Sequence, residues 1–131
     1  MDLNLNILTL ARGLSGHAAE RQAVIAQNVA NADTPDYKAK DIAPFSEVYA
    51  GGTDAPMAML ATRPGHLGAG ADTPNFAVVE TSAFASESPN GNTVSIEDQM
   101  MRAADVKRSH DLALGVYAKS MDILRMALGR R

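Results

Sequence analysis

Two long stretches of helical periodicity, one at each end of the chain, most constrain how this sequence can fold. In the first, mostly apolar side chains recur at alternating steps of four and three residues, the spacing of one helix face. This face contains Leu3, Ile7, Leu10, Leu14, His17, Arg21, Val24, Asn28 and Asn31, and Ala11, Ala18, Ile25 and Val29 widen it. Proline lacks an amide donor and disfavours helix geometry in the residue before it. Pro35 therefore predicts that a helix within residues 1–33 ends near Ala32.

The second stretch repeats the pattern more strictly near the other end of the chain. Its stripe contains Ile96, Met100, Ala103, Lys107, His110, Leu114, Tyr117, Met121, Leu124 and Leu128. Thr93 or Ser95 is the expected N-cap, and Glu97 and Asp98 follow in the first turn, where negative charge is favoured. The sequence therefore predicts a C-terminal helix within residues 93–131.

The segment between the two helices gives a weaker signal. Residues 34–49 contain a short hydrophobic cluster that suits a turn followed by an extended arm or a turn of helix. Residues 50–92 are expected to form a flexible loop, because Gly and Pro are frequent up to residue 75. Within it, residues 76–85 have enough β-branched and aromatic side chains for one strand. We predict a mainly α fold: a coiled-coil-like helix pair with an irregular, partly extended and flexible middle.

The length of the predicted helices indicates an assembling protein. A helix of about 30 residues is about 45 Å long, whereas a compact chain of 131 residues has a radius of gyration of only roughly 14 Å. Such helices overhang the body, and their stability must come from packing because their own hydrogen bonds contribute little net free energy in water. We therefore expect a monomer with partly melted helix ends that order on assembly.

Composition and spacing argue against several other functions. The chain has no cysteine, and His17, His66 and His110 lack helical metal-ligand spacing, so we expect no metal site and no cofactor. No nucleophile, base and orienting residue occur together in a recognisable motif, so we expect no enzyme. The formal net charge of −3 does not suit nucleic acid binding.

The apolar segments are also too short or too interrupted for membrane insertion. No run approaches the roughly 20 apolar residues that span a bilayer. Polar residues interrupt the first thirty positions, so no cleaved secretory signal is recognisable there.

The residues around the end of the first helix resemble a known family. The run Arg21-Gln22-Ala23-Val24-Ile25-Ala26-Gln27-Asn28-Val29-Ala30-Asn31-Ala32-Asp33-Thr34-Pro35-Asp36-Tyr37-Lys38-Ala39-Lys40-Asp41 is similar to the signature of bacterial flagellar rod proteins. The stretches Thr62-Arg63-Pro64-Gly65-His66-Leu67 and Pro89-Asn90-Gly91-Asn92-Thr93-Val94, together with the short length, resemble the proximal rod subunit of the FlgB type. The resemblance covers both ends of the chain.

This resemblance implies a structural subunit of the proximal rod of the flagellar basal body. Such subunits leave the cytoplasm through the flagellar type III export apparatus without a cleaved signal peptide. They stack helically, with the terminal helices around the export channel, and link the membrane ring to the distal rod and hook while transmitting torque. The implied partners are other rod proteins, the membrane-ring and rod-adaptor proteins and the export apparatus.

The periodicity and the resemblance together predict the residues of a subunit interface. These are Leu3, Ile7, Leu10, Leu14, Val24, Ile25, Asn28, Asn31, Pro35, Tyr37, Ile96, Met100, Leu114, Tyr117, Met121, Leu124 and Leu128. Among them, the amides of Asn28 and Asn31 are expected to fix register between packed helices. Pro35 is expected to set the turn, and Tyr37 to anchor the arm.

Two alternative functions stay open at this stage. One is another rod subunit of the same family, because the Asn-Ala-Asp-Thr-Pro signature is shared between them. The other is a helical secretion chaperone that uses its apolar stripes to hold a client. A chaperone has no need of that signature directly after its first helix, so the rod subunit is preferred.

Overall fold

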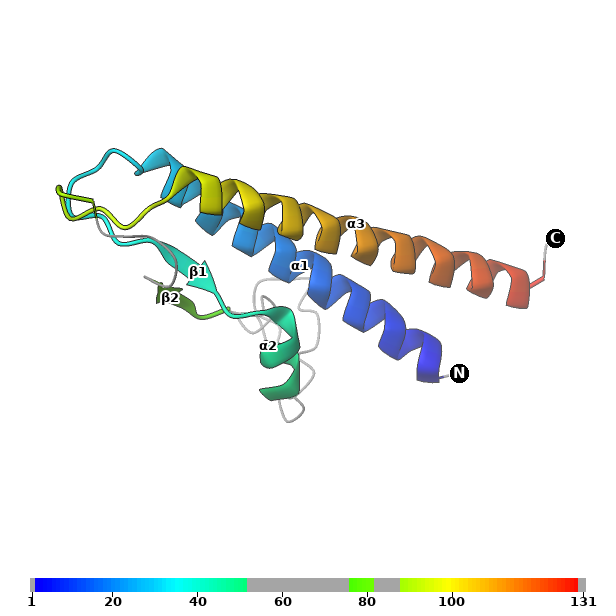
Figure 1. Ribbon diagram of the computed structural model, residues 1–131. Coiled ribbons are helices and arrows are strands. Elements are labelled where there is room, and N and C mark those ends of the chain that lie inside the picture. The colour runs from blue at the N-terminus through cyan, green and yellow to red at the C-terminus, as the bar shows by residue number, and fades with distance from the viewer. Residues whose placement is uncertain (1, 52–75, 82–87, 130–131) are drawn as a thin grey trace, which may run out of the picture.

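The computed structural model describes residues 2–51, 76–81 and 88–129, and of residues 2–5, 50 and 51 it describes the backbone. The elements are α1 (Asp2–Ala30), β1 (Lys40–Ile42), α2 (Phe45–Gly51), β2 (Val78–Glu80) and α3 (Ile96–Ala127). The two long helices lie side by side and antiparallel, so that both ends of the chain lie at the same end of the molecule (Figure 1). The predicted mainly α fold, with paired terminal helices, is confirmed.

The two helices contact each other through positions seven residues apart. In α1 these are Ala11, Ala18 and Ile25, and in α3 they are Gln99, Val106, Ala113 and Ser120, all of them buried. A seven-residue repeat keeps one side of each helix against its partner, as in a coiled coil. Several of these side chains are small, so the two backbones approach closely.

The inward side of α3 is displaced by one residue from the stripe that the sequence predicts. That stripe includes Met100 and Leu114, which are 67% and 50% exposed, whereas Gln99 and Ala113 are 2% exposed. The side of α3 that faces α1 is therefore not this stripe, and Met100 and Leu114, which the sequence assigns to a subunit interface, are exposed. Small residues at 113 and 120 permit a close approach that the larger side chains of the neighbouring positions do not, and Asn28 of α1 provides a buried partner for Gln99.

The start of α3 and the end of α1 lie close to the positions predicted from the sequence. Ser95 is the N-cap of α3, and its hydroxyl accepts a hydrogen bond from the backbone N–H of Asp98. Of the two expected caps, Ser95 is therefore the correct one. The helix α1 ends at Ala30, close to the predicted Ala32, and turn structure follows it.

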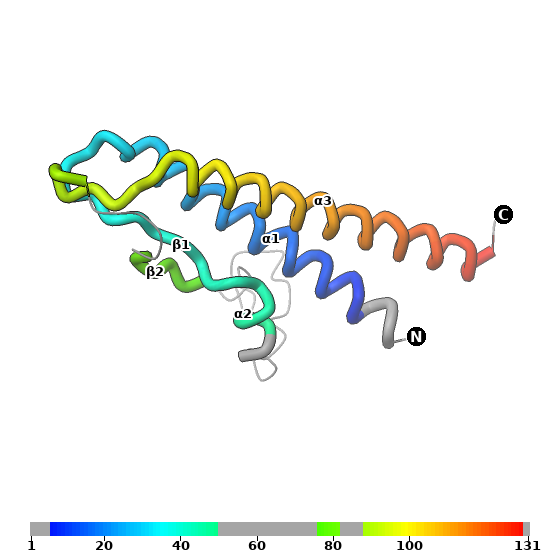
Figure 2. The backbone as a smooth tube through the Cα atoms, viewed as in Figure 1, coloured from blue at the N-terminus to red at the C-terminus, as the bar shows by residue number. Residues whose placement is uncertain are grey.

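The middle segment folds back along α1, as the tube in Figure 2 shows. We call residues 34–51, which contain β1 and α2, the arm. β1 pairs antiparallel with β2 in the register Lys40↔Glu80 and Ile42↔Val78. The arm therefore contains both of the structures that its hydrophobic cluster allowed, and the strand expected within residues 76–85 occurs at 78–80.

A second, small apolar core holds the arm against α1. Val24 of α1, Ile42 of β1 and Phe76 are buried together, and Val48 of α2 packs against them. His17 is also buried; its Nε2 lies 2.8 Å from the carbonyl oxygen of Ala43, and its ring meets Phe76 edge-on at 4.9 Å. His17 therefore has a structural partner within the chain. Of the flexible loop expected at 50–92, residues 52–75 and 82–87 lie outside the described residues.

Candidate assembly interface

A buried amide joins the arm to both long helices. Asn28 of α1 is completely buried, and its Nδ2 donates to the carbonyl oxygen of Lys40 at 2.7 Å and to Oε1 of Gln99 at 3.0 Å. Its Oδ1 accepts from the backbone N–H of Lys40 at 3.0 Å and from the Tyr37 hydroxyl at 3.4 Å. All the hydrogen-bonding capacity of the side chain is therefore used. Asn28 fixes the register of α1 against α3 within one chain, whereas we expected it at a subunit interface.

A second buried amide closes the end of α1. Nδ2 of Asn92 donates to the carbonyl oxygens of Asn31, Ala32 and Thr34 at 2.8–2.9 Å. These carbonyl groups belong to the turn that directly follows α1, and Asn92 provides the donor that they need. In contrast, the Asn31 side chain bonds only locally, to Gln27 and Thr34. The hydrogen bonds of the Asn31 side chain therefore lie within the helix end and the turn after it.

The turn after α1 is shaped by two residues with positive φ. These are Asp36, with φ 57°, and Gly91, with φ 79°. The N–H of Asp36 donates to the carbonyl oxygen of Asn90, and the N–H of Thr93 donates to that of Tyr37. The exposed Pro35 precedes Asp36 in this turn. Tyr37 anchors the start of the arm, as predicted, and burial raises the pKa of its phenol.

An ion network crosses the same region and was not predicted. Asp41 of β1 is buried and accepts two hydrogen bonds of 2.7 Å from Arg21 of α1. Asp41 also pairs with Arg102 of α3, and Arg102 pairs in turn with Asp98 at 2.7 Å. Burial alone raises the pKa of Asp41, but the Arg21 bond, the Ile42 N–H and the charges of both arginines outweigh it and lower that pKa. The arm is thereby fixed to both helices.

Many large apolar side chains of α3 are exposed. One group, which we call the flank, belongs to the predicted stripe and consists of Ile96, Met100, Leu114, Tyr117 and Leu128. Leu128 is 80% exposed. Met121 and Leu124 of the same stripe are half-buried.

A second group, which we call the outer stripe, lies on another side of α3. It consists of Met101, Leu112, Val116, Ile123 and Met126, of which Met101, Leu112 and Met126 are 61–72% exposed. These exposed apolar side chains make α3 a candidate surface for contact with neighbours.

Several residues of the predicted interface point into the chain. Val24, Ile25 and Asn28 are buried, so they stabilise the monomer and are not available to a neighbour in this conformation. Ile7 and Leu10 of α1 are each 38% exposed, Leu14 is half-buried, and Leu3 has no described side chain. The exposed members of the predicted interface therefore concentrate on α3.

Sequence reasoning missed four features of this region: Gln99, Asn92, Asp41 and the outer stripe. Gln99 and Asn92 are polar residues whose partners are more than 50 positions away, so no local pattern marks them. The outer stripe has a signal that could have been found, since Met101, Leu112 and Ile123 recur every 11 residues.

The described residues show no arrangement suited to metal binding. Among residues 2–51, 76–81 and 88–129, no three His, Cys, Asp or Glu side chains come together in a way that could hold an ion. In the same ranges, no helix is long and apolar enough to cross a membrane. The features that remain are the interlocked arm and the exposed faces of α3.

Comparison with known proteins decides the family. A family model described as flagella basal body rod protein matches residues 7–38, which cover most of α1 and the turn that follows it. The flagellar basal body rod protein FlgB of Agrobacterium fabrum is 35% identical over 130 residues, covering 96% of this chain and 95% of that protein. The chain belongs to the FlgB family of flagellar basal body rod proteins. FlgB of Escherichia coli K12 is 38% identical over 105 residues, covering 76% of each chain.

The residues that match the family model can be located in the fold of this FlgB-family chain. The part that matches the family model contains Asn28 and Tyr37 and ends two residues before β1. In this FlgB-family chain, the matched segment therefore runs along most of α1 and ends at the closed end of the helix pair, where the arm begins. The exposed faces of α3 lie outside that segment.

Proposed function

We propose that this chain is a structural subunit of the proximal rod of the bacterial flagellar basal body. In this proposal it polymerises through its terminal helices, links the membrane ring to the distal rod and hook, and transmits torque. The single observation that carries the proposal is the exposed apolar surface of α3, on both the flank and the outer stripe, in a chain that belongs to the FlgB family.

The interlocked end of the molecule suits a part that carries load. The buried amide of Asn28 and the carboxylate of Asp41 each connect three segments of the chain, so that the arm, α1 and α3 move together. Partly buried, fully paired polar networks of this kind hold a defined geometry. We propose that the arm keeps a fixed orientation to the helix pair in the rod, while the exposed side chains of α3 contact neighbours.

The proposal also includes the binding partners of the chain, its location and its path of export. Other rod proteins, the membrane-ring and rod-adaptor proteins and the flagellar type III export apparatus are the proposed partners, and the proposed location is the periplasmic rod, reached without a cleaved signal peptide. We propose no catalysis, no cofactor, no nucleic acid and no direct membrane insertion. A helical secretion chaperone is less well supported, because the relatives that match nearly the whole chain are named as rod proteins.

The test is the location of the protein and the effect of its exposed side chains. Mass spectrometry of purified basal bodies should detect the chain in the rod; its absence there, with the protein present in the cytoplasm, would favour the chaperone. In a strain without the native copy, Leu114→Asp should abolish swimming because it places a charge on the flank. Glu20→Ala, which removes an exposed side chain of α1, should restore swimming fully.

A further inference from the structure

Asn90 stands immediately before Gly91 in the turn that precedes α3 at the closed end of the helix pair. Among the asparagines of the sequence, it alone is followed by glycine. Its side chain is exposed. Glycine has no Cβ to shield its own nitrogen from the preceding side chain, and its backbone rotates more freely than that of any other residue. The side-chain amide of Asn90 is therefore next to a nitrogen that can displace it.

The displacement is an intramolecular reaction. The backbone nitrogen of Gly91 gives its proton to water and bonds to Cγ of Asn90, and the bond between Cγ and Nδ2 breaks. Nδ2 takes up a proton and leaves as ammonia, so that a cyclic imide remains. Water then opens the ring at either carbonyl carbon, which gives aspartate or isoaspartate at position 90. The balance is the uptake of water and the release of ammonia.

Hydrogen bonds of the folded turn restrain the reacting groups. The N–H of Gly91 donates to the carbonyl oxygen of Ser88 at 2.8 Å, so the attacking nitrogen is held by a different partner. Oδ1 of Asn90 accepts from the N–H of Asn92 at 3.1 Å. The N–H of Ser88 donates to the carbonyl oxygen of Asn92 at 2.9 Å and closes the turn. The reaction therefore requires the turn of residues 88–92 to open.

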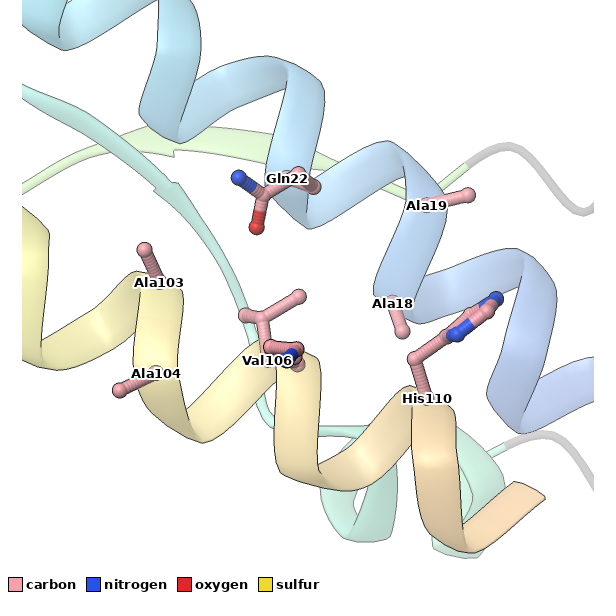
Figure 3. A pocket seen from close by; sticks show the side chains of 8 residues that line it. Ala18, Ala19, Gln22, Ala103, Ala104, Val106 and His110 are labelled. Carbon is pink, nitrogen blue, oxygen red and sulfur yellow. The ribbon is translucent and has the colours of Figure 1, made fainter. Parts of the chain in front are cut away.

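Exposed amides on a long helix are restrained more strongly. Gln22 projects from α1 beside the space between the two long helices (Figure 3), and its side chain is exposed. The N–H groups that follow Gln22 belong to a helix that continues to Ala30, so turning its backbone would break several bonds of the helix at once. The turn at Asn90 lies outside α3 and opens by losing only a local group of bonds.

The isoaspartate product would disturb the closed end of the helix pair. The carbonyl oxygen of Asn90 accepts from the N–H of Asp36 at 2.9 Å, and in isoaspartate this carbonyl becomes a free carboxylate. The side chain of Asp36 lies against Gly91, so the new negative charge stands near a carboxylate of the same charge. An extra carbon also enters the main chain before Asn92, whose amide holds the turn after α1.

We propose that Asn90 is a self-modification site, which converts to aspartate or isoaspartate when the turn of residues 88–92 opens. The folded turn keeps the reaction slow, and the isoaspartate product loosens the closed end of the helix pair. The modification therefore records how long a chain has spent with this turn open. The inference goes beyond the proposed function and does not depend on it, because the reaction takes place within one chain.

The test compares the purified chain in buffer and in urea at the same mildly alkaline pH. Mass spectrometry of proteolytic fragments locates each asparagine whose amide has become a carboxyl group, and an isoaspartyl methyltransferase measures isoaspartate. In urea, Asn90 should react faster than Asn75 and Asn92, which precede larger residues. In buffer, its rate should fall by about tenfold or more, because the hydrogen bonds of the turn must break first. Equal rates for Asn90 in buffer and in urea would overturn the restraint by the fold.

Two variants separate the chemistry from its effect on the fold. Gly91→Ala, measured in urea where its effect on folding has no influence, should slow the reaction of Asn90 severalfold; an unchanged rate would overturn the assignment of the site. Asn90→Asp carries the same added charge as the isoaspartate product without the extra main-chain carbon. The isoaspartate chain should unfold at a lower urea concentration than Asn90→Asp, and equal midpoints would overturn the loosening of the closed end.

Discussion

Nδ2 of Asn28 in α1 donates a hydrogen bond of 3.0 Å to Oε1 of Gln99 in α3, and both side chains are almost completely removed from solvent. Each helix thus contributes one amide to a contact that is otherwise formed mainly by small and apolar side chains. Displacing either helix by one residue separates the two amides and removes this hydrogen bond from a buried site. The pair therefore selects one alignment of α1 against α3.

Replacing Asn28 with Ala should destabilise the chain by about 2–4 kcal/mol, since it leaves the Gln99 amide and the Lys40 backbone groups buried without partners. Urea unfolding followed by circular dichroism measures this as a lower midpoint. Asn31→Ala is the matched control in the same helix. Its bonds are local and exposed, so it should cost about 1 kcal/mol or less. Equal losses for the two variants would contradict the role assigned to Asn28.

Replacing Asp41 with Asn should destabilise the chain by about 2–3 kcal/mol, because it leaves Arg21 and Arg102 without their shared carboxylate in a partly buried site. The matched control is Asp105→Asn, whose pair with Arg108 is largely exposed. Exposed pairs contribute little, so this control should change stability by about 0.5 kcal/mol or less. The two variants are compared by urea unfolding at pH 7.

The contribution of Asp41 should depend on pH in a defined direction. Its pKa in the folded chain lies below the ordinary value of 3.8, because hydrogen bonds and positive charge outweigh burial. The stabilisation is therefore complete above the unfolded pKa and is lost as the pH falls below about 4 towards the folded pKa. The stability difference between the native chain and Asp41→Asn should shrink between pH 5 and pH 3, whereas a difference that widens on acidification would rule out this account.

Replacing Gly91 with Ala should destabilise the chain by about 2–3 kcal/mol. Gly91 has φ 79°, and an added Cβ would lie 2.2 Å from Oδ1 of Asp36, whose own φ is 57°. Both the backbone conformation and the contact therefore oppose any side chain. Gly115→Ala, in the interior of α3 with open space around it, should stabilise the chain by about 0.5–1 kcal/mol. Thermal unfolding of the two variants should show shifts of opposite sign.

The sequence by itself determined the features that depend on neighbouring residues. Helix-forming periodicity, the stop before Pro35 and the serine cap at Ser95 are all set within a few positions, so the bounds of α1 and α3 follow from local chemistry. The surplus of apolar residues on α3 is also readable from the sequence, and it indicates a protein that packs against neighbours. The family signature around Asn28 to Asp41 narrowed the class of assembling protein to a flagellar rod protein.

Tertiary structure alone decided which side of α3 faces α1. That helix has two apolar stripes and a third row that contains Gln99 and Ala113. Periodicity alone does not show which of the three rows packs against α1. The choice depends on side-chain size at the contact and on a polar partner 71 positions away. The same holds for Asp41, whose arginines lie 20 and 61 positions away and meet it only after the arm has folded back. Interactions over such distances depend on the packed arrangement of the whole chain, and no local pattern records them.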